Sequence, residues 1–323
     1  MIELPADQPP ARTARDVYRH IAGRSRFTSP GAGTSELADV VLMTSGSAAT
    51  AKAVGHTYAA IEWSARVSRA VLGDPGWRWL LLLNPLSAGG FMTLARSVRE
   101  PLIWPGLGRR FDSDALMRWY PGGAEATSVV STQLARLLQN PAGVAMLRDM
   151  QVVLVGGGPL HDGLRTRCTE LGIRVVATYG ATETLGGCVY DGVPWPGVHV
   201  TLDDGQIQLD GPNLARSYVP GPAIPRPWPT GDLGRWADGQ LQVLGRIDDQ
   251  IPVKGVNRNL GDYEREALNR PGVLEAVAVA VPDDVDGYRV VVFVEDAEQR
   301  LPRLPTGKPD RRELLRRARG QRR

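Results

Sequence analysis

The stretch TSGSAATAK, residues 44–52, combines residue types that bind phosphate. Its hydroxyls and the backbone N–H groups of its small residues can donate hydrogen bonds to a phosphate, and Lys52 supplies a positive charge. The apolar run ADVVLM before it is typical of a buried strand that leads into a loop. The spacing differs from the P-loop pattern GxxxxGK[ST], and two alanines stand where such a loop favours glycine. Taken alone, the stretch fits a small-residue turn between core elements equally well.

A second stretch, YGATET at residues 179–184, follows the apolar, β-branched run IRVVA. Tyr179 can stack on a base, Thr182 can bind a phosphate, and Glu183 can bind a magnesium ion. Ligands of α/β sheets gather at the carboxyl ends of the strands, so the position favours a binding role. A glycine turn followed by a helix-capping threonine is the structural alternative.

Turns further along the chain carry more charged groups. Asp232 lies in PTGDLGRW, where a fixed carboxylate can accept the two vicinal hydroxyls of a ribose. The stretch GRIDDQ adds Arg246 and the acidic pair Asp248 and Asp249, which suit either a salt-bridged linker or a hinge. Lys308 lies in LPTGKPD, and a lysine on a mobile loop can stabilise charge that develops at a reacting centre. Each of these residues also fits an ordinary turn or surface position.

The elements that must position these residues follow an alternating pattern. Apolar runs near residues 38–43, 79–85 and 150–158 are each followed by a helical pattern, at 56–72, 91–97 and 161–171 respectively. An early helix is expected at 14–22. A further strand is expected at 173–180. This alternation predicts an α/β fold with a mostly parallel sheet.

After residue 190 the pattern changes to short strands and turns, in which DDGQ and ADGQ predict hairpins. A second α/β segment follows, with a helix at 261–269, strands at 275–283 and 289–296, and a final helix. We therefore predict a large domain, residues 1–246, that includes a β-rich subdomain. A small mobile domain, residues 247–323, is expected to follow on a hinge.

Composition narrows the class of protein. The chain has 323 residues, 42% of them apolar and 23% charged, with a net charge of +3, which is ordinary for a globular protein. The sequence contains no apolar run of about 20 residues and no secretory signal, which predicts a cytoplasmic protein without a membrane span. Two isolated cysteines and four scattered histidines argue against a zinc site. The arginine-rich end, RRELLRRARGQRR, fits a solvated helix end better than a nucleic-acid contact.

The order of the motifs is more specific than any one of them. TSGSxxxxK, GGGPL, YGATE, TGDLGRW, GRIDD and LPTGK occur in this sequence in the order found in the adenylate-forming superfamily, and the resemblance covers residues 38–315. Within that superfamily, the chain is most similar to the short 2-succinylbenzoate CoA ligases of menaquinone synthesis. The passage from TYGATETLGG to PNLARSY carries that likeness, as do STQLARLL and DDQIPVKGVNRNL.

The resemblance implies two half reactions. A carboxylic acid attacks ATP to give an acyl adenylate, and a thiol, usually of coenzyme A, then displaces AMP. ATP, Mg²⁺ and coenzyme A are the implied cofactors, and a small carboxylic acid is the implied partner, with homodimer formation left open. Rotation of the small domain between the two steps is also implied.

The resemblance assigns a role to each matching position. The ATP-binding positions are Thr44, Ser45, Gly46, Ser47, Lys52, Gly156, Gly157, Gly158, Thr178, Tyr179, Gly180, Asp232 and Arg246. The catalytic positions are Lys308, Thr182 and Glu183, and Glu183 is also the magnesium ligand. The acid pocket would comprise Ser87, Gly89, Gly90, Ser131 and Gly187. Asp248 would be the hinge, and Gly255 would lie beside the tunnel for the thiol.

The chain departs from the family pattern at several points. The family's phosphate loop reads TSG[ST]TGxPKG, so alanine replaces other residues at positions 48, 49, 51 and 53. An alanine that must adopt a positive φ costs on the order of 1 kcal/mol. The stretch NPLSAGG suggests a reshaped acid pocket. The N-terminal subdomain and the small domain are both expected to be shorter than in long relatives.

Two alternatives follow from these departures. One is a specialised biosynthetic adenylase that transfers the acyl group to an amine, a hydroxyl or a carrier protein instead of coenzyme A. The other is a non-catalytic relative that binds nucleotide without turnover. The sequence retains four of the assigned residues, and together they argue against the second alternative: Glu183, Asp232, Arg246 and Lys308.

Overall fold

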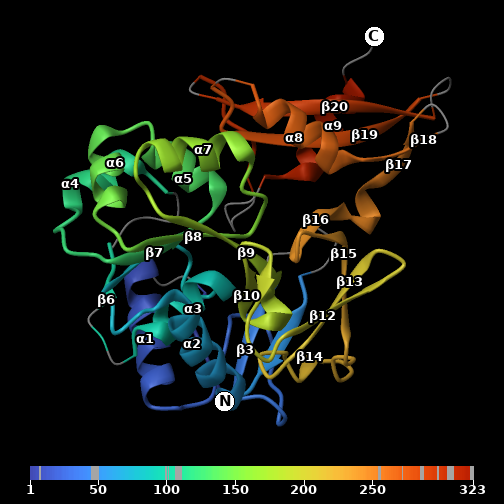
Figure 1. The fold of residues 1–323 in the computed structure, drawn as a ribbon. Helices are drawn as coiled ribbons and strands as arrows, with labels where there is room; N and C mark the ends of the chain where they lie inside the picture. The colour runs from blue at the N-terminus through green and yellow to red at the C-terminus, as the bar shows by residue number, and fades with distance from the viewer. Residues whose placement is uncertain are drawn as a thin grey trace.

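Three sheets build the part of the chain that carries most of the predicted site. The computed structural model describes residues 1–6, 9–44, 51–98, 100, 102–105, 111–253, 256–270, 272–283, 287–296, 298–303 and 309–320. Across these ranges, no helix is both long enough and apolar enough to cross a membrane. The arrangement of the elements can be followed in Figure 1.

The largest sheet has seven strands. In spatial order they are β11 (Val193–Pro194), β10 (Gly186–Tyr190), β9 (Val175–Ala181), β8 (Val152–Val155), β7 (Ala126–Val129), β5 (Trp79–Leu81) and β6 (Leu102–Ile103). The strands from β6 to β9 are parallel to their neighbours, whereas β10 and β11 pair antiparallel. All four residues of β8 are buried, as expected for a parallel strand covered on both faces.

Alternate residues of β8 face two different cores. Val153 and Val155 belong to one apolar cluster with residues of α4 (Ser113–Trp119), α5 (Ser131–Leu137), α6 (Pro141–Arg148) and α7 (Asp162–Glu170). Val152 and Leu154 pack in a second cluster that includes residues of α2 (Tyr58–Leu72). Helices therefore cover both faces, and the mostly parallel α/β sheet predicted from the sequence is confirmed.

Two neighbouring strands of a mixed five-stranded sheet lie directly before and after the predicted phosphate loop. Its order is β1 (Ile2–Glu3), β2 (Phe27–Thr28), β3 (Val40–Met43), β4 (Ala53–His56) and β14 (Ser217–Val219). Beside it, α1 (Pro10–Ala22) and α3 (Ala88–Arg96) share an apolar cluster with β3. Because β3 and β4 are antiparallel neighbours, Thr44 and Lys52, the two ends of the predicted phosphate loop, lie next to each other.

The structure corrects the start of one expected helix. The sequence pattern placed a helix from residue 56, but His56 is the last residue of β4, and α2 begins at Tyr58. Thr57 is the N-cap and accepts a hydrogen bond from the Ala60 N–H at 3.2 Å. Strand β4 is short and fully buried, so its apolar residues did not differ in pattern from those of the helix that follows.

An antiparallel sheet forms the β-rich subdomain. Its strands are β12 (His199–Asp203), β13 (Gln206–Asp210), β15 (Trp228–Ala237) and β16 (Gln240–Arg246). Both predicted hairpins are confirmed. Each has an Asp-Gly turn with positive φ at both residues, 47° and 80° at 204–205 and 50° and 76° at 238–239.

The C-terminal elements lie at the top of Figure 1, in orange and red. After a short turn at Ile247–Asp249 come β17 (Gln250–Val253), β18 (Val256–Asn259), α8 (Leu260–Leu268), β19 (Glu275–Asp283), β20 (Gly287–Glu295) and α9 (Arg311–Gly320). The β19–β20 hairpin carries apolar residues on both faces. Val277 and Val279 cluster with Leu314 of α9, and Ala278 clusters with Leu260 of α8. The domain boundary at 246/247 stays a prediction.

A buried carboxylate joins the C-terminal hairpin to helix α5. Glu295, at the end of β20, has 0% exposed side chain and accepts a hydrogen bond from Arg136 of α5. Arg300 and Arg303 also contact Glu295, at 2.9 and 2.6 Å. Burial alone would raise the pKa of Glu295, but the hydrogen bonds from Arg136, the Leu301 N–H and Arg303 lower it to about 2.

We predict that Glu295→Gln destabilises the protein by about 3 kcal/mol at neutral pH, because three arginines lose their shared partner. The folded pKa lies below the usual value, so the stabilisation is fully present above about pH 4.5. It should shrink as the pH falls toward 2. Urea unfolding of wild type and variant between pH 7 and pH 3 measures this, with the exposed Glu298→Gln as the matched control. A gap in stability that stays constant over this pH range would contradict it.

Candidate functional site

The ends of β8 and β9 place two predicted motifs side by side. Gly156 directly follows β8, and Thr178 lies in the neighbouring parallel strand β9. A Cβ at Gly156 would lie 2.4 Å from the Thr178 hydroxyl, so a larger residue cannot occupy this position without displacing the threonine. Gly157 has a φ of +75°. The GGG loop and the YGATE stretch therefore meet at the carboxyl edge of the sheet.

The partly buried carboxylate of Asp232 lies opposite Tyr179. The tyrosine hydroxyl donates a hydrogen bond of 2.8 Å to Asp232 Oδ2, and Arg246 donates one of 3.1 Å to Oδ1. Asp232 and Arg246 are register partners in the β15–β16 pair, so the hairpin holds them together. Three residues that the sequence analysis assigned to one nucleotide are thus in contact.

Burial raises the pKa values of both Asp232 and Tyr179. Burial raises the pKa of Asp232, while the hydrogen bond from Tyr179 and the charge of Arg246 act in the opposite direction. The pKa of Tyr179 lies well above its usual value, because of burial and the nearby Asp232 charge. Tyr179 therefore stays a proton donor, and Asp232 keeps lone pairs that can accept hydroxyl hydrogen bonds from a ligand.

Glu183 lies on a tight turn after β9. Residues Thr182–Thr184 form a single 3₁₀ turn, and Leu185 ends it with a φ of +58°. The Glu183 side chain is mostly buried and accepts a hydrogen bond from the Tyr218 hydroxyl at 3.2 Å. A Cβ at Gly180 would lie 2.0 Å from the Gly186 carbonyl oxygen, so glycine is required for the turn to fold back on itself.

The two ends of the predicted phosphate loop are hydrogen-bonded to each other. The Thr44 N–H donates to the Lys52 carbonyl at 2.7 Å, and the Lys52 N–H donates to the Thr44 hydroxyl at 2.9 Å. The Lys52 ammonium lies 5.0 Å from the centre of the Tyr218 ring. Ser45, Gly46 and Ser47 lie outside the described residues.

The magnesium assignment is compatible with the groups around Glu183. The described residues contain no group of three or more His, Cys, Asp and Glu side chains that could enclose a metal ion. Mg²⁺, however, is usually held by one or two carboxylates together with substrate phosphates and water. A single carboxylate near the ends of a phosphate loop fits that mode of binding.

The predicted acid-pocket residues lie in two separate places. Ser87 caps α3: its hydroxyl accepts from the Gly90 N–H at 3.2 Å and donates to the Asn84 carbonyl at 2.7 Å. The start of α3 packs near Gly186, next to the predicted pocket residue Gly187. Gly89 also lies at this start of α3.

Ser131, the remaining pocket residue, lies at the start of α5. It donates a hydrogen bond to the Pro159 carbonyl at 2.7 Å. This bond ties it to the end of the GGG loop rather than to α3.

The other predicted positions lie in the C-terminal part. Asp248 is 86% exposed and lies 4.0 Å from Arg246. Gly255 and Lys308 lie outside the described residues. The segments on both sides of the Lys308 loop do pair: residues Arg303 and Pro309 form a β-bridge, and the Asp310 N–H donates to the Pro302 carbonyl at 2.7 Å.

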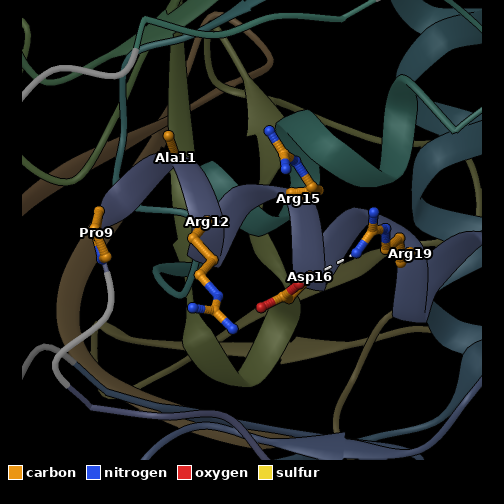
Figure 2. Close-up of a pocket in the computed structure, with 6 residues that line it drawn as sticks. All are labelled: Pro9, Ala11, Arg12, Arg15, Asp16 and Arg19. Atoms are coloured by element: carbon orange, nitrogen blue, oxygen red, sulfur yellow. Dashed lines mark ion pairs between the residues drawn. The ribbon is translucent and has the colours of Figure 1, made fainter.

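A surface hollow of about 510 Å³ lies elsewhere, along helix α1. Figure 2 shows that its lining side chains come from one stretch of that helix and include Arg12, Arg15 and Arg19. Asp16 is 3.8 Å from Arg19. No predicted site residue lines this hollow, so it is not part of the candidate site.

Sequence reasoning did not single out Tyr218, which contacts both Lys52 and Glu183. It also missed Trp228, whose indole N–H donates to the Tyr218 hydroxyl at 3.3 Å. The only available signal was their place in a β-rich segment after the YGATE motif.

The fold and the site define the class as an α/β protein with a ligand site at the strand ends, joined to a β-rich subdomain. The family model described as AMP-binding enzyme matches residues 16–219, and the chain belongs to this family.

Curated and solved relatives include 2-succinylbenzoate CoA ligases. The chain is 36% identical to a probable 2-succinylbenzoate–CoA ligase of Mycobacterium tuberculosis, over 79% of this chain and 70% of that protein. It is 30% identical to the 2-succinylbenzoate–CoA ligase of Escherichia coli, over 78% of this chain and 57% of that protein. The Bacillus subtilis o-succinylbenzoate CoA synthetase MenE in complex with OSB-AMP has the same fold, with a TM-score of 0.73 at 22% identity. That match covers 94% of this chain and 80% of MenE.

Proposed function

We propose that this protein is an ATP-dependent, AMP-forming ligase that activates 2-succinylbenzoate or a closely related aryl acid and transfers it to coenzyme A. The observation that carries the proposal is the contact of Asp232 on β15 with both Tyr179 and Arg246. In a member of the AMP-binding family, such a carboxylate suits the ribose of ATP. Similarity to the two curated ligases supports the choice of acid.

The residues act mainly by binding and orientation. Asp232 accepts hydrogen bonds from the ribose hydroxyls, held in place by Tyr179 and Arg246. Thr182 and Lys52 contact the phosphates, so the α-phosphorus is presented to the acid carboxylate. The start of α3 and Gly187 border the acid. Correct orientation of the two reactants supplies much of the acceleration in such a reaction.

Charge stabilisation completes the proposed site. Mg²⁺, when bound at Glu183, would neutralise the polyphosphate of ATP and of the leaving pyrophosphate. Lys308 would stabilise the charge shared by the acid carboxylate and the α-phosphate as they react. Asp248, exposed and at the junction of β16 and β17, is the proposed hinge.

Acid-dependent exchange of pyrophosphate into ATP tests the first half reaction. The panel should contain 2-succinylbenzoate, benzoate, other succinyl-aryl acids and an aliphatic acid. We predict exchange with 2-succinylbenzoate, at a rate at least tenfold above that with benzoate. Absence of exchange with every acid would support the non-catalytic alternative and contradict the proposal.

Addition of coenzyme A to the same mixtures tests the second half reaction. Formation of a thioester, followed by chromatography, is the expected result. Exchange without thioester formation would instead favour the specialised adenylase that uses an amine, a hydroxyl or a carrier protein. The shortness of the small domain is the reason to include this arm.

A further inference from the structure

Tyr218 connects two parts of the proposed ATP site that come from distant parts of the chain. It lies on β14, the edge strand that pairs with β4. Its ring faces the Lys52 ammonium at 5.0 Å, and its hydroxyl donates to Glu183 Oε1 at 3.2 Å. The proposed phosphate-binding lysine and the proposed metal ligand therefore contact the ring and the hydroxyl of one side chain.

Trp228 fixes the direction of the tyrosine hydroxyl. The indole N–H can only donate, and it donates to the Tyr218 oxygen at 3.3 Å. The tyrosine proton is then free to point at Glu183, giving the order Trp228 to Tyr218 to Glu183. Trp228 is 7% exposed, so solvent rarely competes for its N–H.

The carboxylate of Glu183 has little other support from side chains. Tyr218 donates the one side-chain hydrogen bond that Glu183 receives within the described part of the chain. Its backbone carbonyl accepts from the Ala215 N–H at 2.8 Å, which fixes the main chain but leaves the side-chain rotamer to Tyr218. One oxygen is thus oriented, and the other is left to a ligand.

We propose that Tyr218 is a positioning residue that sets the Glu183 carboxylate for Mg²⁺ and the Lys52 ammonium for the ATP phosphates. The inference rests on the proposed function, since it concerns the same ATP site. Partners that orient a metal ligand typically change metal affinity by about 10- to 100-fold when removed. A cation held over an aromatic ring gains a smaller stabilisation.

Two substitutions separate the two contacts. Tyr218→Phe removes the hydrogen bond to Glu183 but keeps the ring under Lys52. Tyr218→Leu removes both. We expect Tyr218→Phe to weaken metal binding about tenfold with little change in metal-free nucleotide affinity. Tyr218→Leu should weaken metal binding similarly and also lower metal-free nucleotide affinity by about threefold or more.

Direct measurements of nucleotide and metal binding test these expectations. The full-length protein is saturated with α,β-methylene-ATP, which cannot be cleaved at the bond that adenylation breaks. Mn²⁺ then replaces Mg²⁺ as the probe, titrated by electron paramagnetic resonance, and calorimetry measures the metal-free nucleotide. Thermal unfolding checks that each variant is folded; if the leucine variant is not, the phenylalanine variant decides.

Tyr58→Phe is the matched control. Its hydroxyl also contacts two hydrogen-bond partners, the His20 and Ser25 carbonyls at 2.9 and 2.8 Å, neither of which belongs to the proposed ATP site. Equal Mn²⁺ affinity in Tyr218→Phe and wild type would overturn the inference while leaving the proposed function intact. Equal losses in Tyr218→Phe and Tyr58→Phe would overturn it as well. Wild-type protein that binds neither nucleotide nor Mn²⁺ would overturn the proposed function and this inference together.

Discussion

Lys308→Ala is expected to lower acid-dependent ATP–pyrophosphate exchange by about 100-fold or more, while ATP affinity stays close to that of wild type. The reason is that the proposed lysine contact forms with charge that develops during the reaction, and loss of one such contact typically costs two to three orders of magnitude. Exchange kinetics measure the first quantity, and calorimetry with α,β-methylene-ATP measures the second.

The composition of the chain supports a special role for this residue. Of its 38 lysines and arginines, only Lys52, Lys254 and Lys308 are lysines. A chain that otherwise uses arginine keeps lysine in LPTGK, where a compact charge on a flexible stem can reach between two anionic groups.

Lys308→Arg is therefore the sharpest companion variant to Lys308→Ala. It preserves the charge but replaces the compact ammonium with a planar fork, and we expect it to remain well below wild type. Near-normal exchange in Lys308→Ala would refute the assigned role. If Lys308→Arg alone retained full activity, the role of Lys308 would be limited to supplying a positive charge.

Much of the fold could be predicted because it depends on local patterns. The turns at 204–205 and 238–239 require positive φ at both positions. The dipeptide Asp-Gly favours this conformation, so two adjacent residues are enough to predict each turn. The buried strands β5 and β8 read as continuous apolar runs, whereas the buried strand β7, with the sequence ATSV, does not, and the sequence pattern did not predict it.

Strand β4 was missed for the opposite reason. It is a four-residue strand whose pairing with β3 and β14 depends on residues that are distant in sequence or lie across a loop. Its residues carry no periodicity of their own that separates them from helix α2.

In the candidate site, too, some residues could be predicted from local motifs and others could not. Tyr179, Glu183 and Asp232 lie in short motifs whose order along the chain is informative, so the sequence could nominate them. Tyr218 is 35 residues from Glu183, and Glu295 is 159 residues from Arg136. Contacts of that kind follow from how sheets and helices pack, and one sequence does not report them.

Asp232→Ala is expected to weaken ATP binding by about 100-fold. A hydrogen bond to a charged group contributes about 1.5–3 kcal/mol, and the proposed ribose contact involves two hydroxyls. The substitution also leaves Tyr179 and Arg246 without their shared partner. Calorimetric titration with ATP measures the loss.

A cycle of ligands and variants isolates the ribose contact from this structural effect. Wild type should bind 2′,3′-dideoxy-ATP much more weakly than ATP, whereas Asp232→Ala should bind both with similar, low affinity. Asp210→Ala is the matched control, because Asp210, on β13 of the same sheet, also pairs with an arginine, Arg226 at 3.3 Å. That variant should keep the full preference for ATP. If Asp232→Ala also keeps the preference, the carboxylate does not bind the ribose, and its contacts with Tyr179 and Arg246 serve only to hold the β15–β16 hairpin against β9.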